Sequence, residues 1–180
     1  MDIIQAAKNK IELEITNIES RTDLRPEAKC SRIIHIFSVT CAAVAVQPIP
    51  FADIFVLTPI QAYMGVRLSA IWGMPLSDAE VTDLLKEIAG IVGLGMIAQQ
   101  IALGLYKVGL PFLAGFTTIP LVYGLTYAIG RVMEHYLEKK SRGQNLSKVE
   151  IKNIWNTFRE EGKQKAKSAK GEVKAKKAEF

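Results

Sequence analysis

The chain has 180 residues, of which 49% are hydrophobic and 23% are charged, and its formal net charge is +5. This length suits one domain with a sizeable core, and the composition excludes a globally disordered chain. Residues 141–180 hold eleven Lys/Arg and five Asp/Glu, whereas residues 1–140 have a net charge of −1. Because the basic character belongs to the C-terminal part, we do not expect nucleic acid as a partner of the main body.

Residues 1–25 are predicted to form a soluble amphipathic helix followed by a turn. Apolar residues recur there at helical spacing, with charges on the opposite face. They are Ile3, Ile4, Ala7, Ile11, Ile15 and Ile18. Asp2 and the charged stretch 8–14 interrupt any apolar core of a signal peptide, so we expect the protein to start in the cytoplasm.

Residues 26–140 are predicted to form a hydrophobic domain of helical hairpins. Three stretches carry no fixed charge: 33–52, 88–106 and 108–130. Their lengths match a bilayer-spanning helix, and we expect the second hairpin to insert more readily than the first. Buried polar residues oppose insertion, and a soluble bundle of long helices could cover the same faces with protein. Both interpretations stay open from the sequence.

An internal repeat supports the hairpin interpretation. The pattern Pro-Phe-x3-Phe-x3-Pro occurs at 50–59 and again at 111–120, an offset of 61. We interpret each copy as a long helix, a tight proline turn and a second helix kinked by proline. The residues assigned to hairpin tips and kinks are Pro48, Pro50, Asp53, Thr58, Pro59, Gln61, Pro111 and Pro120. We expect Asp53 to cap a helix, with an ion or proton site as the alternative.

Small residues at helical spacing predict close helix packing. Glycine costs a soluble helix up to about 1 kcal/mol per residue, so its density here calls for a packing role. The glycines assigned to helix contacts are Gly90, Gly93, Gly95, Gly104 and Gly124.

Residues 141–161 are predicted to form an amphipathic helix that starts at a capping box of Ser147 and Glu150. Its apolar stripe either folds back on the body or docks a partner. The stripe consists of Ile151, Ile154, Trp155 and Phe158. Residues 162–180 are a Lys/Ala-rich tail that we expect to be disordered or only weakly helical. Seven lysines are candidates for contact with anionic lipid, although a purely solvated tail is an alternative. They are Lys163, Lys165, Lys167, Lys170, Lys174, Lys176 and Lys177.

No constellation for catalysis, metal binding or cofactor binding emerges from the sequence. His35 and His135 are the only histidines, and neither has a recognisable partner for nucleophilic catalysis. We interpret Cys30 and Cys41 as reduced core thiols. The protein is therefore predicted not to be an enzyme, and no cofactor is expected.

Two stretches resemble a known family. They are PIPFADIFVLTPIQAYMGVRLSAIWG (48–73) and TYAIGRVMEHYLE (126–138), and they resemble bacterial domain-of-unknown-function family 697, which includes YcjF-like membrane proteins. Trp72-Gly73 stands where the family pattern has Tyr-Gly. The resemblance implies a helical, membrane-associated domain that is often fused to, or encoded beside, Era-like GTPases, and it supplies no catalytic residues. This chain has no phosphate-binding loop, so a GTPase would act in trans.

Together these features predict an all-α protein with two tandem helical hairpins, an N-terminal amphipathic helix, and a C-terminal helix with a basic tail. The leading hypothesis is a protein at the cytoplasmic face of the bacterial inner membrane that anchors or regulates a partner. The alternatives are a pore- or channel-forming homo-oligomer and a soluble helical interaction module.

Overall fold

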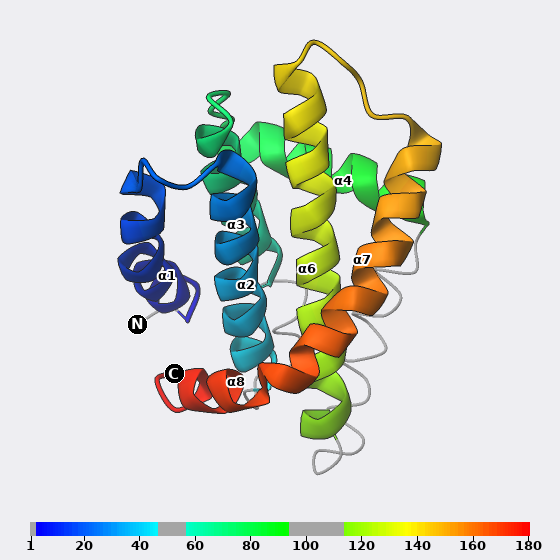
Figure 1. Ribbon diagram of the computed structural model, residues 1–180. Helices are drawn as coiled ribbons and strands as arrows, with labels where there is room; N and C mark the ends of the chain where they lie inside the picture. Colours follow the sequence, from blue (N-terminus) through cyan, green and yellow to red (C-terminus); the bar gives the residue numbers. More distant parts are fainter. Residues whose placement is uncertain (1–2, 47–56, 94–113) are drawn as a thin grey trace.

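The computed structural model describes residues 3–46, 57–93 and 114–180 (Figure 1). These residues form seven α-helices and no strand, which confirms the predicted all-α class. The helices are α1 (Ile3–Ser20), α2 (Pro26–Ala45), α3 (Thr58–Ile71), α4 (Asp78–Val92), α6 (Ala114–Ser141), α7 (Lys148–Ser168) and α8 (Lys170–Lys177).

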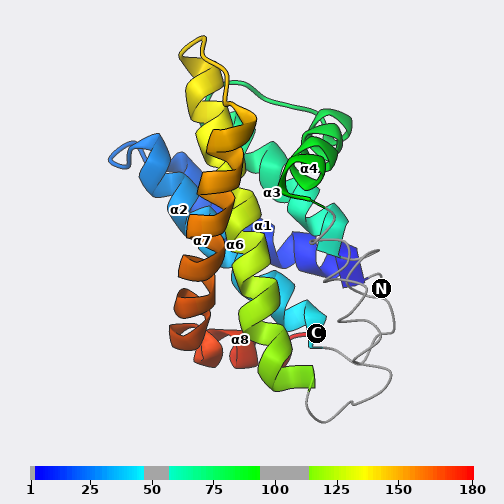
Figure 2. The same ribbon diagram turned by 90° about the vertical axis from the view of Figure 1, so that its right-hand side faces the viewer.

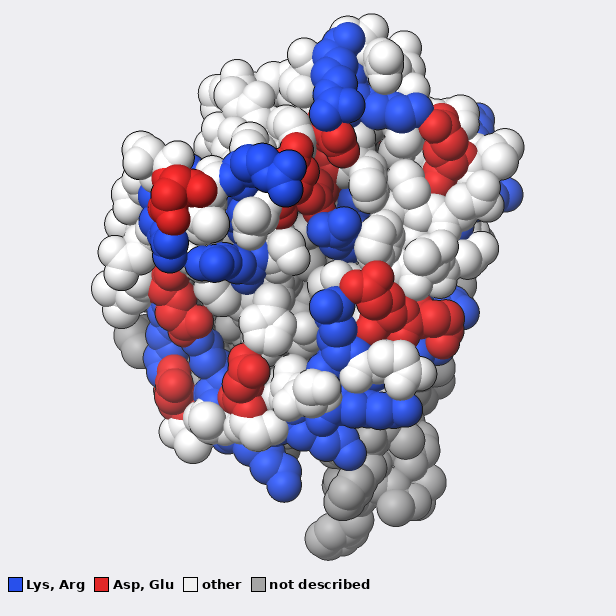
Figure 3. All heavy atoms as spheres, viewed as in Figure 1, with Lys and Arg blue, Asp and Glu red and all other residues white. Residues whose placement is uncertain are grey.

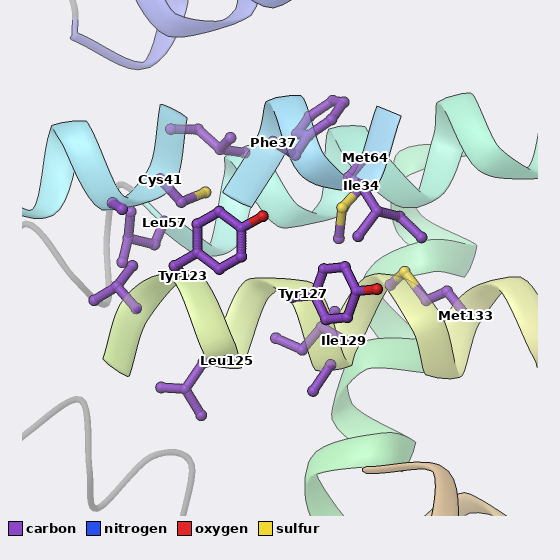
Figure 4. Packing of buried hydrophobic residues seen from close by; sticks show 14 of the residues in the cluster. Ile34, Phe37, Cys41, Leu57, Met64, Tyr123, Leu125, Tyr127, Ile129 and Met133 are labelled. Carbon is purple, nitrogen blue, oxygen red and sulfur yellow. The ribbon is translucent and has the colours of Figure 1, made fainter. Parts of the chain in front are cut away.

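Helix α2 lies at the centre of the bundle, in contact with α1, α3, α6 and α8. Twelve of its twenty residues are buried, including Cys30 and Cys41, which are both free thiols as predicted. Figure 4 shows side chains of α2, α3 and α6 in this core, among them Cys41, Met64 and Tyr123. Each large side chain buried in this way contributes about 1.5–3 kcal/mol of hydrophobic stabilisation.

Helix α2 is also the one described helix that is long and apolar enough to cross a membrane. Its mean hydropathy over the apolar window is 1.3, yet 67% of that window is buried inside the bundle. In this structure the apolar surface of α2 is therefore covered mainly by the chain's own helices.

Two turns of the same design join α3 to α4 and α6 to α7. In each, a glycine with positive φ follows the first helix, and a capping box starts the next: Gly73 before Ser77, and Gly143 before Ser147. The positive φ values, 69° and 70°, belong to the left-handed region that favours glycine. The shared pattern Gly-x2-Leu-Ser-x2-Glu recurs at an offset of 70, so the described residues contain a repeat that the offset of 61 did not capture.

The predicted repeat at offset 61 falls mostly outside the described residues, and it stays a prediction. Its two described prolines differ in position: Pro59 lies in the first turn of α3, whereas Pro120 lies inside α6. The first turn tolerates proline because its N–H groups have no partner within the helix. Whether a helix begins before Leu57 lies outside the described residues, so the expectation that Pro59 kinks a longer helix stays a prediction.

The expectation of a disordered or weakly helical tail is wrong. Helix α7 continues past the predicted boundary at residue 161 to Ser168, and α8 follows immediately. Lys and Ala both favour helix, and the tail buries Ala166, Ala169 and Val173 in the core of the bundle. Figures 1 and 2 show α8 turning across one end of the bundle.

Candidate functional site

The tail is fastened to the bundle by a chain of polar contacts through three helices. His35 Nδ1 lies 2.7 Å from the hydroxyl of the fully buried Tyr123 in α6, and His35 Nε2 lies 2.8 Å from Glu172 Oε2 in α8. Because a carboxylate only accepts hydrogen bonds, Nε2 carries the proton that Glu172 accepts, while Nδ1 and the Tyr123 hydroxyl share the other hydrogen bond. This arrangement positions Glu172 against the middle of α2.

Ion pairs fasten the far end of the tail to α1. Lys176 is 7% exposed and pairs with Glu14, and Lys10 Nζ lies 3.0 Å from Glu179 Oε2. Burial lowers the pKa of Lys176, with the neighbouring Glu179 opposing that shift. The tail therefore has a defined rotation about its own axis, because Val173 and Lys176 face the bundle.

That rotation sets the direction of the remaining lysines of α8. At 100° per residue, Lys170, Lys174 and Lys177 share one face of the helix, roughly opposite Glu172. Since Glu172 reaches toward the middle of α2, the three lysines point away from it, past the end of the bundle. All three are exposed, and we call them the lysine stripe. Figure 3 shows Lys and Arg side chains along this lower end of the molecule.

The lysine stripe lies where two other helices end. In both ribbon views the C-terminal end of α2, the N-terminal end of α6 and α8 share the lower end of the bundle (Figures 1 and 2). The chain continues from these helix ends into residues 47–56 and 94–113, whose only charged residues are Asp53 and Lys107. The lysine stripe therefore lies near the end of α2 and the start of α6, and these helix ends are followed and preceded in the chain by nearly uncharged sequence.

The structure separates the seven lysines that the sequence grouped as candidates for lipid contact. Lys163 pairs with Glu160 at 2.8 Å, and Lys165 lies 3.6 Å from Glu161. Lys176 is buried and paired, as described above. Within the described residues, Lys167, Lys170 and Lys174 make no ion pair, which leaves their charges free for an external anion. The spacing of Lys163 from Glu160 and of Lys165 from Glu161 could have predicted these two pairs from the sequence. The burial of Lys176 against Glu14 could not, because the two residues are distant in the chain.

The opposite end of the bundle holds a buried acidic group. Glu134 of α6 is 2% exposed, and burial raises its pKa to about 7. Arg131, with Nη1 2.7 Å from Glu134 Oε2, opposes this shift, whereas Glu138 and Glu27 add to it. The described residues contain no group of three His, Cys, Asp or Glu side chains arranged to hold a metal ion.

The structure describes only some of the residues that were assigned to hairpin tips and kinks. Pro48, Pro50, Asp53 and Pro111 lie outside the described residues. Thr58 begins α3, and Gln61 is buried, where its amide donates a 3.1 Å hydrogen bond to the hydroxyl of Thr126 in α6. Gln61 therefore joins two helices of the bundle core.

The glycines predicted to lie at helix contacts differ in how closely other residues approach them. An added Cβ at Gly124 would lie 3.1 Å from the Arg159 carbonyl oxygen, so this glycine does allow α6 and α7 to approach closely. Gly90 and Gly93 have nothing within 4 Å of an added Cβ among the described residues, so no close contact explains them. Gly95 and Gly104 lie outside the described residues. The partner of Gly124 is Gly162, which the sequence analysis assigned to the tail.

The apolar stripe of α7 folds back on the body. Ile151 and Trp155 are 4% and 5% exposed, and the Phe158 ring lies under the Arg131 guanidinium at 4.5 Å. Ile154 packs against the same core. Docking of a partner through these four residues would require α7 to leave α6, and it stays a prediction.

Comparison with known proteins identifies a family and a relative of this chain. The family model "Domain of unknown function (DUF697)" matches residues 14–163, most of the chain. The chain belongs to the DUF697 family. Magnetosome membrane protein 22 of Magnetospirillum gryphiswaldense is 29% identical over 147 residues, which cover 79% of this chain and 75% of that protein. No solved structure matches the chain. The match confirms the family resemblance seen in the sequence.

Proposed function

We propose that this DUF697 protein is a membrane-associated helical bundle that anchors or regulates a partner at the cytoplasmic face of the bacterial inner membrane. The observation that carries the proposal is the similarity to a protein named as a magnetosome membrane protein over about three quarters of both chains. The long uncharged stretches of the sequence support it.

The geometry favours attachment through one end of the bundle over a membrane-spanning α2. Helix α2 passes the test of length and hydropathy, but α1, α3, α6 and α8 surround it. Exposing α2 to lipid would require these helices to separate and would break the contacts of His35 with Tyr123 and Glu172. A bundle that keeps its core and contacts lipid at one end avoids both costs.

Carbonate extraction and vesicle flotation test the proposal. We expect the expressed protein to fractionate with membranes and to float with vesicles. Retention after carbonate would support insertion of the uncharged stretches, whereas release by carbonate would exclude an integral attachment. A protein that neither fractionates with membranes nor floats would contradict the proposal and favour the soluble interaction module.

The partner role rests on the family resemblance, which points to a GTPase acting in trans. The experiment mixes the purified protein with an Era-like GTPase from the same organism, loaded with GDP or with a non-hydrolysable GTP analogue, and follows the complex by size-exclusion chromatography. We expect one nucleotide state to bind more tightly. Absence of a complex in both states would remove the GTPase from the proposal and leave membrane association untouched.

A further inference from the structure

We propose that the lysine stripe of α8 (Lys170, Lys174 and Lys177) is a contact surface for anionic phospholipid headgroups, so that the end of the bundle carrying α8 faces the membrane. This inference rests on the proposed membrane association and adds to it an orientation and a lipid chemistry.

The first argument comes from the way the tail is held. Glu172 bonds to His35, and Lys176 pairs with Glu14, so α8 cannot rotate without breaking contacts to α2 and α1. Lysines placed roughly opposite Glu172 then point beyond the end of the bundle. A solvated tail does not require a fixed orientation. A helix that contacts an anionic membrane surface binds it better when its lysines lie on one face.

The second argument is electrostatic. Lys170 and Lys174 have no acidic partner among the described residues, while the tail's own carboxylates, Glu172 and Glu179, are engaged by His35 and Lys10. Each of these two carboxylates therefore already has a partner on α2 or α1. Lys170 and Lys174 therefore present positive charge outward, which is complementary to an anionic leaflet.

The third argument is the location. The stripe lies at the end of the bundle where α2 ends and α6 begins (Figures 1 and 2). The adjoining residues 47–56 and 94–113 carry one negative and one positive charge between them. Basic residues near helix ends that lead in the chain to uncharged sequence are a combination expected of a protein that meets a membrane surface.

The test compares a triple variant of the stripe with a matched control. Lys170→Gln, Lys174→Gln and Lys177→Gln remove three exposed charges from α8. The control, Arg25→Gln, Lys148→Gln and Lys152→Gln, removes three exposed charges at the start of α2 and of α7, toward the opposite end of the bundle. A charge-preserving variant with arginine at the three stripe positions separates the loss of charge from damage to α8. Thermal unfolding checks that each variant is folded.

Binding of the full chain is measured by flotation with vesicles of phosphatidylglycerol mixed with phosphatidylcholine, and with vesicles of phosphatidylcholine alone. Each lysine near an anionic surface contributes about fivefold in affinity, so the stripe variant should bind anionic vesicles on the order of 100-fold more weakly. The control and the arginine variant should bind like the wild type. Added salt should weaken wild-type binding, because it screens these charges.

Equal binding of the stripe variant and the control to anionic vesicles would overturn the inference. Equal binding of the wild type to both kinds of vesicle would also overturn it, while leaving membrane association standing. If the wild type binds neither, the proposed function fails as well. A duplex DNA bound through the stripe, with vesicle binding unaffected by the variant, would replace the lipid surface with nucleic acid as the partner.

Discussion

Alanine in place of glycine should change the free energy of unfolding in opposite directions at two helical positions. Gly162 lies where α7 crosses α6, whereas Gly90 lies in α4. At Gly162 an added Cβ would lie 2.8 Å from the Cα of Gly124 and 3.0 Å from the Cβ of Tyr127. Carbon atoms normally approach no closer than about 3.5 Å, so the two helices would have to separate by roughly 0.7 Å at this point. The atom in the way at Gly124 is backbone and cannot turn aside.

The expected magnitude follows from two opposing effects of Gly162→Ala. Overpacking a well-packed contact costs about 1–3 kcal/mol. Replacing glycine by alanine inside a helix returns up to about 1 kcal/mol. We therefore expect Gly162→Ala to lower the free energy of unfolding by about 1 kcal/mol or more. In Gly90→Ala, where no atom of the described residues lies within 4 Å of the added Cβ, only the gain remains, and stability should rise by about 0.5–1 kcal/mol.

Urea unfolding followed by circular dichroism measures both changes, and thermal unfolding should show shifts of about 2–4 °C per kcal/mol in a chain of this size. The two variants have the same chemistry and differ only in what the new methyl group meets. If Gly162→Ala were as stable as Gly90→Ala, the close crossing of α6 and α7 would be refuted. The whole position of the tail would then be in doubt, because α8 follows directly from α7.

Three further predictions concern the interior and the helix ends. Since the pKa of Glu134 is raised to about 7 from an ordinary 4.5, the free energy of unfolding of the wild type should fall by about 3 kcal/mol as the pH rises from about 4.5 to about 7.5. Urea unfolding of Glu134→Gln should lack this fall. Parallel pH profiles of the two proteins would contradict the assignment. Ser147→Ala should cost about 1 kcal/mol through loss of the capping box, whereas the exposed neighbour Val149→Ala should change stability by less than about 0.5 kcal/mol; equal effects would argue against the cap. Val173→Ala should cost about 2 kcal/mol and accelerate hydrogen exchange in α8, unlike Lys174→Ala, and unchanged exchange would show that the tail is not held by this contact.

Local sequence signals predicted the helix starts well. Ser147 with Glu150 begins α7 where the sequence placed it, because a capping box depends on residues only three positions apart, and Ser77 with Glu80 begins α4 by the same pattern. The N-terminal amphipathic helix was predicted equally well, since its buried face repeats at helical spacing. These features need no knowledge of the rest of the chain.

The position of the tail could not be predicted, because it depends on contacts between distant residues. Glu172 meets His35 across 137 positions, and Glu14 meets Lys176 across more than 160. A Lys/Ala-rich segment has the composition of a solvated tail, and only a complementary surface on α1 and α2 turns it into a packed helix. The lysine stripe could not be recognised in the sequence for the same reason, because its direction depends on those contacts.

The burial of α2 was also undetermined by the sequence. A helix with no fixed charge from Ile33 to its end satisfies the criteria for lipid and for a protein core alike. The structure distinguishes the two through residues outside α2. Tyr123 and Gly130 of α6 fit closely against it, and an added Cβ at Gly130 would lie 2.7 Å from Ile34.

The central claim is that α2 remains covered by the chain's own helices when the protein is at the membrane. Photo-crosslinking from diazirine-labelled acyl chains in vesicles, with the modified positions located by mass spectrometry, tests it most directly. We expect no lipid adducts on residues 33–45 of α2 in the vesicle-bound, folded protein. Adducts spread along these residues would show that lipid replaces α6 and α8 around α2, and would contradict the account.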